Sequence, residues 1–396
     1  MADYVYLDYA ATAPLCEEAA QALRGFLETG APHLEAGGGN ANSLHTPGRR
    51  AFDLMEKARK SIAKDLNASR PAEIIFTAGA TESDNMALFG LTRGALEQRH
   101  KQGKHSAGHI IVSAVEHDAV LEPARRLERE GVAVTVLPVN KGGFVEPFQL
   151  EAAFREDTVL VSVMMANSEV GSVQPVQELA AIAHKHGALF HTDATQALGK
   201  IPVDLQKLGA DAVSFSGHKI GAPKGIGLLY LKARTPFQPQ LLGGGQEEGR
   251  RSGTQNVPGM CALAAACRAA VEMQAAEAQR LTALRDWLYE RLGAMKRVSP
   301  TVQVASGNGD YLPNIVHVLV SGMESETLII RLDYAGFGVS GGSACASHSL
   351  EPSHVLKAMG VSADKAYGAL RISMGRYTTQ EQLEAFIAAL QDCIQK

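Results

Sequence analysis

The stretch "AVSFSGHKIGAPKGIG", residues 212–227, joins a buried strand to residues with binding and catalytic chemistry. Its opening residues are small or apolar, as expected for a strand buried on both faces of a sheet. Ser216, Gly217 and His218 follow, and Lys219 comes next. A lysine at the end of a buried strand needs a carboxylate partner or a covalent role, because burial favours the neutral amine that attacks carbonyl groups. The stretch therefore predicts a reactive lysine at the edge of a sheet.

Six further short apolar runs share the character of this strand. They are nearly continuous rather than alternating, which is typical of strands buried on both faces. Helical patterns at 120–131 and 176–187 lie between some of them, and each ends in the glycine that often follows a helix. This alternation predicts an α/β fold with a mostly parallel central sheet covered by helices. The six runs are residues 73–79, 109–115, 132–139, 158–167, 188–194 and 226–232.

The pattern of the chain changes at about residue 258. A long alanine-rich helical region over 260–295 leads into shorter strands and helices. A chain of 396 residues is long enough for two domains. We therefore expect a large domain over residues 15–257 and a smaller α+β domain formed by residues 1–14 and 258–396.

Composition and charge exclude several classes of protein. The net charge of −4 and the lack of a basic block argue against binding to nucleic acid or to a membrane surface. No apolar run is long enough to span a membrane, and "MADYVYLDYA" has no signal-peptide layout. Because the cysteines are odd in number, scattered and free of CxxC pairs, we expect a cytoplasmic protein without a disulfide framework or a metal site. These cysteines are Cys16, Cys261, Cys267, Cys345 and Cys393.

Polar residues with distinct chemistry follow three other predicted strands. Ligands of an open parallel sheet bind outside the carboxyl ends of its strands. Thr81 follows a glycine turn at the start of a helix, where backbone N–H groups attract phosphate, although a helix cap alone is the alternative. Asp193 ends a strand and precedes Gln196. A buried carboxylate needs a cation or hydrogen-bond donors, which a ligand could supply, and the alternative to a ligand is a structural salt bridge. His117 follows the strand at 109–115.

These residues suit pyridoxal phosphate. Lys219 would form an imine with the cofactor, and Asp193 would keep the pyridine nitrogen protonated, so that the ring can act as an electron sink. His117 could stack on the ring and transfer protons. Nucleotide-binding loops are absent from the sequence, since no GxGxxG follows the first strand and no GxxxxGK[ST] occurs.

The sequence resembles the cysteine desulfurases of group I, the NifS/IscS-like branch of the class V aminotransferase superfamily of fold-type I pyridoxal-phosphate enzymes. The resemblance runs along nearly the whole chain and in order. The most specific segment is "SGGSACASHSLEPSHVL" at 340–356, whereas the segment around Lys219 is shared with other pyridoxal enzymes. The further segments that carry the resemblance are 6–14, 40–48, 79–85, 116–120, 167–175, 192–200, 215–227, 249–258 and 369–377.

The resemblance implies a role for each residue of the predicted cofactor site. It gives Lys219, Asp193 and His117 the roles stated above, and it places Gln196 at the ring hydroxyl group. It also implies a homodimer in which Thr254 of one subunit reaches the phosphate bound by the other. The remaining residues expected to hold the phosphate are Ala80, Thr81, Ser216, Gly217 and His218.

The resemblance also implies L-cysteine as the substrate. Arg371 would clamp its carboxylate, a bidentate task suited to a guanidinium group. Asn42 would lie near that carboxylate. Ser168 would contact the substrate from a position at which the family usually has asparagine.

Cys345 lies in a run of glycine, serine and alanine over about 339–349 that we expect to be mobile. The resemblance implies that its thiolate takes the sulfur of cysteine as a persulfide, leaves alanine, and passes the sulfur to an acceptor protein for iron–sulfur cluster or related biosynthesis. One alternative is a pyridoxal-phosphate lyase that cleaves cystine or selenocysteine without a protein thiol. Another is a non-catalytic sulfur carrier that retains the fold.

Overall fold

The computed structural model describes residues 4–27, 38–342 and 352–395. Cys345 and residues 343–349 of the predicted mobile loop lie outside the described residues.

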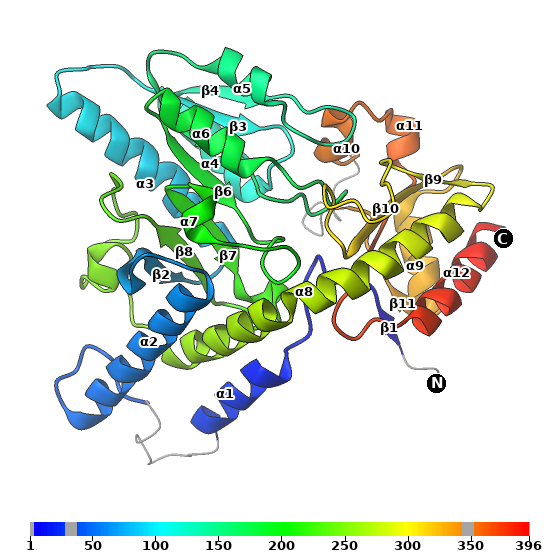
Figure 1. The fold of residues 1–396 in the computed structure, drawn as a ribbon, viewed down its shortest axis with the longest axis horizontal. Coiled ribbons are helices and arrows are strands. Elements are labelled where there is room, and N and C mark those ends of the chain that lie inside the picture. Colours follow the sequence, from blue (N-terminus) through cyan, green and yellow to red (C-terminus); the bar gives the residue numbers. More distant parts are fainter. Residues whose placement is uncertain (1–3, 28–37, 343–351, 396) are drawn as a thin grey trace.

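A seven-stranded sheet forms the centre of one half of the molecule (Figure 1). Its strands lie in the order β2-β8-β7-β6-β5-β3-β4. All neighbours are parallel except β8, which is antiparallel to both β2 and β7. The predicted α/β fold with a mostly parallel central sheet is therefore confirmed. The strands are β2 (Ile74–Thr77), β3 (His109–Ser113), β4 (Ala133–Leu137), β5 (Thr158–Ser162), β6 (Leu189–Asp193), β7 (Ala212–Ser216) and β8 (Gly227–Leu231).

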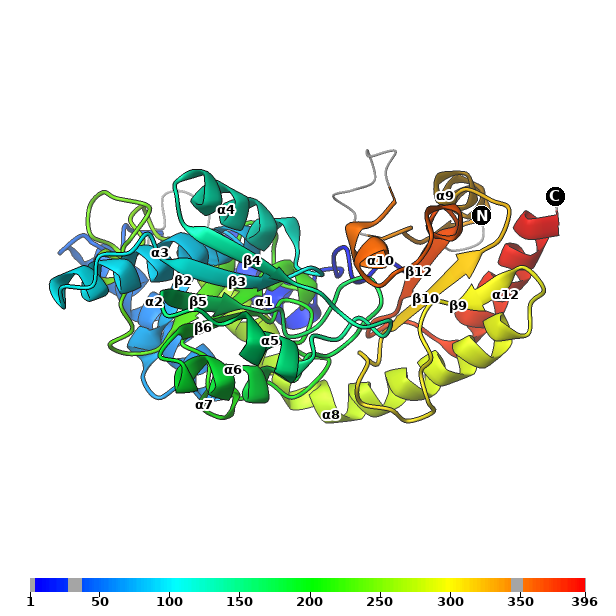
Figure 2. The same cartoon turned by 90° about the horizontal axis from the view of Figure 1, so that it is seen from above.

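Helices cover both faces of this sheet, as Figure 2 shows. On one face α3 and α4 pack against the strands, with the apolar core centred on residues such as Ile110 and Leu160. On the other face α2, α6 and the first half of α8 enclose a second apolar core that contains Phe190 and Phe215. The helices of this half are α1 (Glu17–Leu27), α2 (Thr46–Asp65), α3 (Ala80–Lys101), α4 (Asp118–Arg129), α5 (Pro147–Ala153), α6 (Val176–Lys185), α7 (Leu205–Leu208) and α8 (Val257–Gly293).

The expectation that every strand is buried on both faces is wrong for β4. This strand pairs only with β3 at the edge of the sheet, and Val136 is 52% exposed. β4 has only one neighbouring strand, and its faces are covered incompletely. Its apolar run therefore does not indicate burial on both faces. The other six strands are buried as predicted, with Leu189 of β6 as the one partly buried residue.

The predicted helix ends after α4 and α6 are confirmed. Gly131 and Gly187 follow these helices with φ values of 98° and 74°, the left-handed conformation that glycine adopts without a steric penalty.

A smaller sheet forms the other half of the molecule. Its three antiparallel strands lie in the order β12-β10-β9, and β1 (Val5–Tyr6) pairs in parallel with β11 (Phe337–Gly338) beside them. The second half of α8 packs here, so this long helix runs from the core of one half to the core of the other. The remaining elements are β9 (Val298–Pro300), β10 (Ile315–Val320), α9 (Ser325–Tyr334), α10 (His354–Ala358), α11 (Ala363–Ala366), β12 (Ala369–Ser373) and α12 (Gln380–Gln395).

The division into a large domain over 15–257 and a smaller one over 1–14 and 258–396 stays a prediction. Within the described residues, none of the helices has the length and apolar character needed to cross a membrane.

Replacing Gly227 by alanine should destabilise the junction of β8 with the turn that opens α3. A Cβ atom at Gly227 would lie 2.7 Å from the Cα atom of Gly79 and 2.7 Å from the carbonyl oxygen of Phe215. Both contacts are with backbone, which cannot rotate away, so we expect a loss of about 1–3 kcal/mol in the free energy of unfolding. Urea denaturation measures this loss.

Gly25→Ala is the matched control. Gly25 lies within α1, and a Cβ atom there would meet no atom within 4 Å. We expect this variant to be as stable as the wild type or slightly more stable, because alanine favours the helix. Equal stability of the Gly227→Ala and Gly25→Ala variants would contradict the packing described here.

Candidate active site

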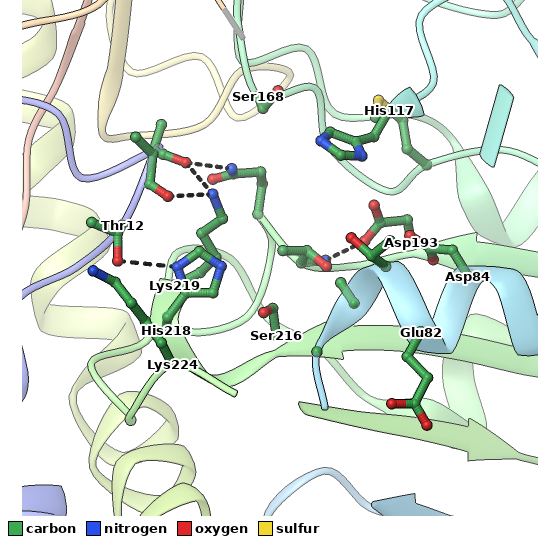
Figure 3. Close-up of a pocket in the computed structure, with 18 of the residues that line it drawn as sticks. Thr12, Glu82, Asp84, His117, Ser168, Asp193, Ser216, His218, Lys219 and Lys224 are labelled. Carbon is green, nitrogen blue, oxygen red and sulfur yellow. Dashed lines mark hydrogen bonds between the residues drawn. The ribbon is translucent and has the colours of Figure 1, made fainter. Parts of the chain in front are cut away.

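A cavity of about 960 Å³ opens at the carboxyl ends of β6 and β7 (Figure 3). The turn before α3, the turn before α4 and the N-terminal segment at 10–12 contribute to its walls, and β12 of the smaller sheet closes one side. Ten of the predicted site residues line it: Ala80, Thr81, His117, Ser168, Asp193, Gln196, Ser216, His218, Lys219 and Arg371.

Four predicted site residues are not among those that line the cavity. Gly217 is buried between Ser216 and His218. Asn42 and Thr254 lie elsewhere on the chain: the amide of Asn42 donates to Oε1 of Gln255 at 3.3 Å, and Thr254 is exposed. Cys345, the fourth, lies outside the described residues.

The amine of Lys219 is held by backbone carbonyl groups. Lys219 ends the short 3₁₀ helix η3 (Gly217–Lys219), which follows β7 directly. Its Nζ atom donates to the carbonyl oxygens of Ala10 and Ala11 at 2.6 and 2.7 Å. Nε2 of Gln196 donates to the same oxygen of Ala10 at 3.0 Å. Figure 3 shows this group of bonds on the wall of the cavity.

Asp193 ends β6 and is 7% exposed. Its Oδ1 atom accepts a hydrogen bond from the backbone N–H of Thr195 at 2.9 Å. Two further carboxyl groups, those of Asp84 and Glu116, are fully buried nearby. Burial, and then the charge of Asp193, raises the pKa of Asp84 well above its usual value, and burial raises the pKa of Glu116 to about 8. Glu116 is therefore mostly protonated at neutral pH, and burial disfavours the charged form of Asp84, so both limit the negative charge around Asp193.

The two histidines of the cavity are held by specific hydrogen bonds. His117 caps α4, and its Nδ1 atom accepts from the backbone N–H of Ala119 at 3.1 Å, which leaves the proton of a neutral ring on Nε2. Nδ1 of His218 lies 3.0 Å from Oγ1 of Thr12. Burial, followed by the charges of Lys219 and Lys224, lowers the pKa of His218 to about 4, so this ring is neutral at neutral pH.

The start of α3 is arranged to receive an anion. Its cap residue, Gly79, has no side chain to satisfy the first backbone N–H groups of the helix. The one acidic residue of the first turn, Glu82, is bound elsewhere: it accepts from the backbone N–H of Ala78 at 2.9 Å and pairs with Nε of Arg251 at 2.7 Å. This turn therefore presents donors to the cavity while its carboxylate is neutralised.

Arg371 brings a buried guanidinium group to the cavity from β12. It is 1% exposed, and it donates to Oδ1 of Asp8 at 2.8 Å and to the carbonyl oxygen of Ser168 at 2.9 Å. Its Nε atom is buried without a hydrogen-bond partner in the part of the chain that the structure describes. Each terminal nitrogen of the guanidinium group carries a second N–H, and Arg371 lines the cavity, so donors remain for a ligand with a carboxylate.

Comparisons with known proteins agree with this architecture. Residues 5–386 match the aminotransferase class V family. The cysteine desulfurase IscS of Dictyoglomus turgidum is 43% identical over 392 residues, which cover 99% of this chain and 95% of that protein. The chain belongs to the class V aminotransferase family, among the cysteine desulfurases.

Two solved structures of this family have the same fold. A NifS-like protein has a TM-score of 0.87 at 37% identity, with 98% of each chain covered. The structure of SspA in complex with cysteine has a TM-score of 0.77 at 33% identity and covers 95% of this chain and 100% of that one. The fold expected of a fold-type I enzyme is therefore confirmed for this member of the class V family.

Several residues of this class V site were not predicted. Thr12, Asp84 and Lys224 line the cavity, and Glu116 lies buried beside it. All four fall within segments that carry the family resemblance, but nothing local marks the bond of Thr12 to His218 or the burial of Asp84. The contacts that define these residues are made with segments distant in the sequence.

Replacing Glu116 by glutamine should make the free energy of unfolding less dependent on pH. A glutamate side chain in the unfolded chain ionises near its ordinary value of 4.5, whereas burial keeps folded Glu116 protonated up to about pH 8. Between these values the folded wild type binds more protons than the unfolded chain, so its stability falls as the pH rises. We expect the stability of Glu116→Gln relative to the wild type to rise by up to a few kcal/mol across this window, measured by urea denaturation.

The control is Glu122→Gln, which changes an exposed carboxylate on α4. Its stability should follow that of the wild type at every pH. If Glu116→Gln also followed the wild type throughout the window, the buried neutral state of Glu116 would be wrong.

Proposed function

We propose that this protein is a pyridoxal-phosphate-dependent cysteine desulfurase, which converts L-cysteine to L-alanine and takes the sulfur on Cys345. The observation that carries the proposal is the single cavity in which Lys219, Asp193, His117 and Arg371 meet. The IscS name of the 43% identical relative and the cysteine bound by SspA support this reaction and this substrate.

The residues of the cavity fit pyridoxal phosphate. The volume of about 960 Å³ has room for the cofactor and a small amino acid. Lys219 would hold the aldehyde, Asp193 the pyridine nitrogen and Gln196 the ring hydroxyl. The uncapped start of α3 suits a phosphate group, because backbone N–H groups and the helix dipole both favour an anion. The phosphate would be held there by Ala80 and Thr81, together with Ser216, Gly217 and His218.

The bound cofactor supplies an electron sink for the α-carbon of the substrate. Arg371 orients the substrate through the substrate carboxylate, which would accept from the terminal N–H groups of the guanidinium. Ser168 would add a contact to the substrate, and Asn42, which does not line the cavity of its own chain, would reach the substrate only across a dimer interface. His117 lies on the cavity wall with its Nε2 proton, where it can stack on the ring and move protons.

Cys345 completes the proposed reaction. Its thiolate forms a bond to the substrate sulfur while the carbon–sulfur bond breaks. The electron pair of that bond stays with the carbon, which takes up a proton and becomes the methyl group of alanine. The sulfur then remains on Cys345 as a persulfide for an acceptor protein, and a cytoplasmic location is predicted for this transfer.

Product analysis of two variants tests the reaction. Wild-type protein incubated with L-cysteine and a reductant should release sulfide and alanine in equal amounts. Lys219→Ala should release neither product. Cys345→Ala should lose nearly all sulfide release, and mass spectrometry should find the added sulfur on residue 345 of the wild type only.

Cys393→Ser is the control, because Cys393 is a partly buried residue of α12. It should keep the activity of the wild type. Full activity of Cys345→Ala would instead favour the alternative, a lyase for cystine or selenocysteine that uses no protein thiol.

A homodimer with shared active sites is part of this proposal. Thr254 is exposed in the single chain and does not line the cavity of its own subunit. Asn42 bonds to Gln255, which is next to Thr254, and Leu44 near this contact is 89% exposed. Thr254 is thus accessible to another subunit, as the proposal requires.

Mixed dimers test whether Thr254 acts across the interface. A dimer of one Lys219→Ala subunit and one Thr254→Ala subunit contains one intact site if Thr254 serves the other subunit. Such a hybrid should retain about half of the wild-type activity, whereas each variant alone should be impaired. A hybrid with no activity above that of its parents would show that Thr254 serves its own subunit or none.

A further inference from the structure

The ammonium group of Lys200 reaches the main chain of the reactive lysine. Lys200 lies in the turn after β6, and its Nζ atom donates to the carbonyl oxygen of Lys219 at 2.7 Å and to that of Leu198 at 3.3 Å. The mechanism above gives Lys200 no role. It does not line the large cavity, although the lysine that it contacts does.

We propose that Lys200 is a positioning residue for Lys219. The ammonium group of Lys200 ties the main chain of Lys219 to the segment 193–200, which carries Asp193 and Gln196. The inference rests on the proposed function, in which Lys219 holds the cofactor.

The bonds of Lys219 explain how this positioning works. Its side-chain amine is held by the carbonyl groups of Ala10 and Ala11, and its own carbonyl is held by Lys200. The lysine is therefore fixed at both ends. Lys200 follows Asp193 and Gln196 in the same segment of the chain. Its bond to Lys219 therefore holds the amine that would bind the aldehyde at a fixed position relative to the two side chains that would bind the ring.

The surroundings of Lys200 leave its charge without a carboxylate partner. It lines a second cavity of about 100 Å³ beside Lys219, much of which is formed by apolar residues of α8. The acidic residue on this wall, Glu277, pairs with Arg280 at 2.8 Å. Among the described residues, no carboxylate lies within ion-pair distance of Lys200. The other titratable residues lining this cavity are Tyr9, Cys16, Lys219, Arg376 and Tyr377, of which Arg376 pairs with Glu18 at 3.0 Å.

Lys200 therefore acts as a nearby positive charge on Lys219. Burial, and then the charge of Lys219, lowers the pKa of Lys200 to about 8, so the group is mostly protonated at neutral pH. Two like charges disfavour each other, and a lysine beside a second cation loses its proton more readily. The same ammonium thus holds the lysine in place and favours release of the proton from its nitrogen.

Three substitutions at Lys200 separate the effect of its hydrogen bond to the carbonyl oxygen of Lys219 from the effect of its positive charge. Lys200→Met removes both and keeps an unbranched apolar stem, Lys200→Gln keeps a donor without the charge, and Lys200→Arg keeps both. The readouts are the pH midpoint of the absorbance change of the cofactor-loaded enzyme and the rate at which pyridoxal phosphate loads onto the apoenzyme. Thermal unfolding reports whether each variant is folded.

We expect the absorbance midpoint of Lys200→Met and Lys200→Gln to rise by about half a pH unit or more, because a positive charge has been removed. Cofactor loading of Lys200→Met should slow several-fold, and Lys200→Gln should load faster than Lys200→Met. Lys200→Arg should resemble the wild type, as should Lys207→Met, which changes an exposed lysine on α7. A folded Lys200→Met variant with the midpoint and loading rate of the wild type would overturn the inference.

Borohydride reduction of the loaded wild type separates this inference from the proposed function. Mass spectrometry should find the reduced cofactor on Lys219. If it is absent there, the proposed function fails. If it is present and Lys200→Met matches the wild type in both readouts, the inference about Lys200 alone fails.

Discussion

The main chain of Ala10 connects the two halves of the molecule at the cavity. Its N–H donates to Oγ of Ser373 on the smaller sheet at 2.9 Å, and its carbonyl oxygen accepts from Lys219 and Gln196 at the end of the larger one. These bonds link the two sheets through one residue and hold the amine of Lys219 between them.

Burial controls which groups around the cavity carry charge. Burial disfavours the charged forms of Asp84 and Glu116, and His218 is neutral because burial and the nearby lysines disfavour its imidazolium form. The buried guanidinium of Arg371 forms an ion pair with Asp8 at 2.8 Å. The walls thus present a small number of charges at positions where a ligand with a phosphate or a carboxylate can use them.

The sequence predicted much of the fold and many of the site residues. The apolar runs located the seven strands of the central sheet, and the polar residues behind them named Lys219, Asp193 and His117, which do meet in one cavity. The same pattern misjudged β4, because an apolar run has the same appearance in an edge strand as in a central one. Lys200 escaped prediction, since its contact with the carbonyl of Lys219 depends on how two turns pack.

The sequence by itself located the strands of the central sheet and the chemical groups at their carboxyl ends, because burial patterns and turns are encoded by neighbouring residues. The tertiary structure alone decided that residues 10–12 form a wall of the cavity beside those groups. It also decided which carboxyl and imidazole groups are neutral. Contacts between distant segments, and the desolvation that sets protonation, arise only when the chain is packed.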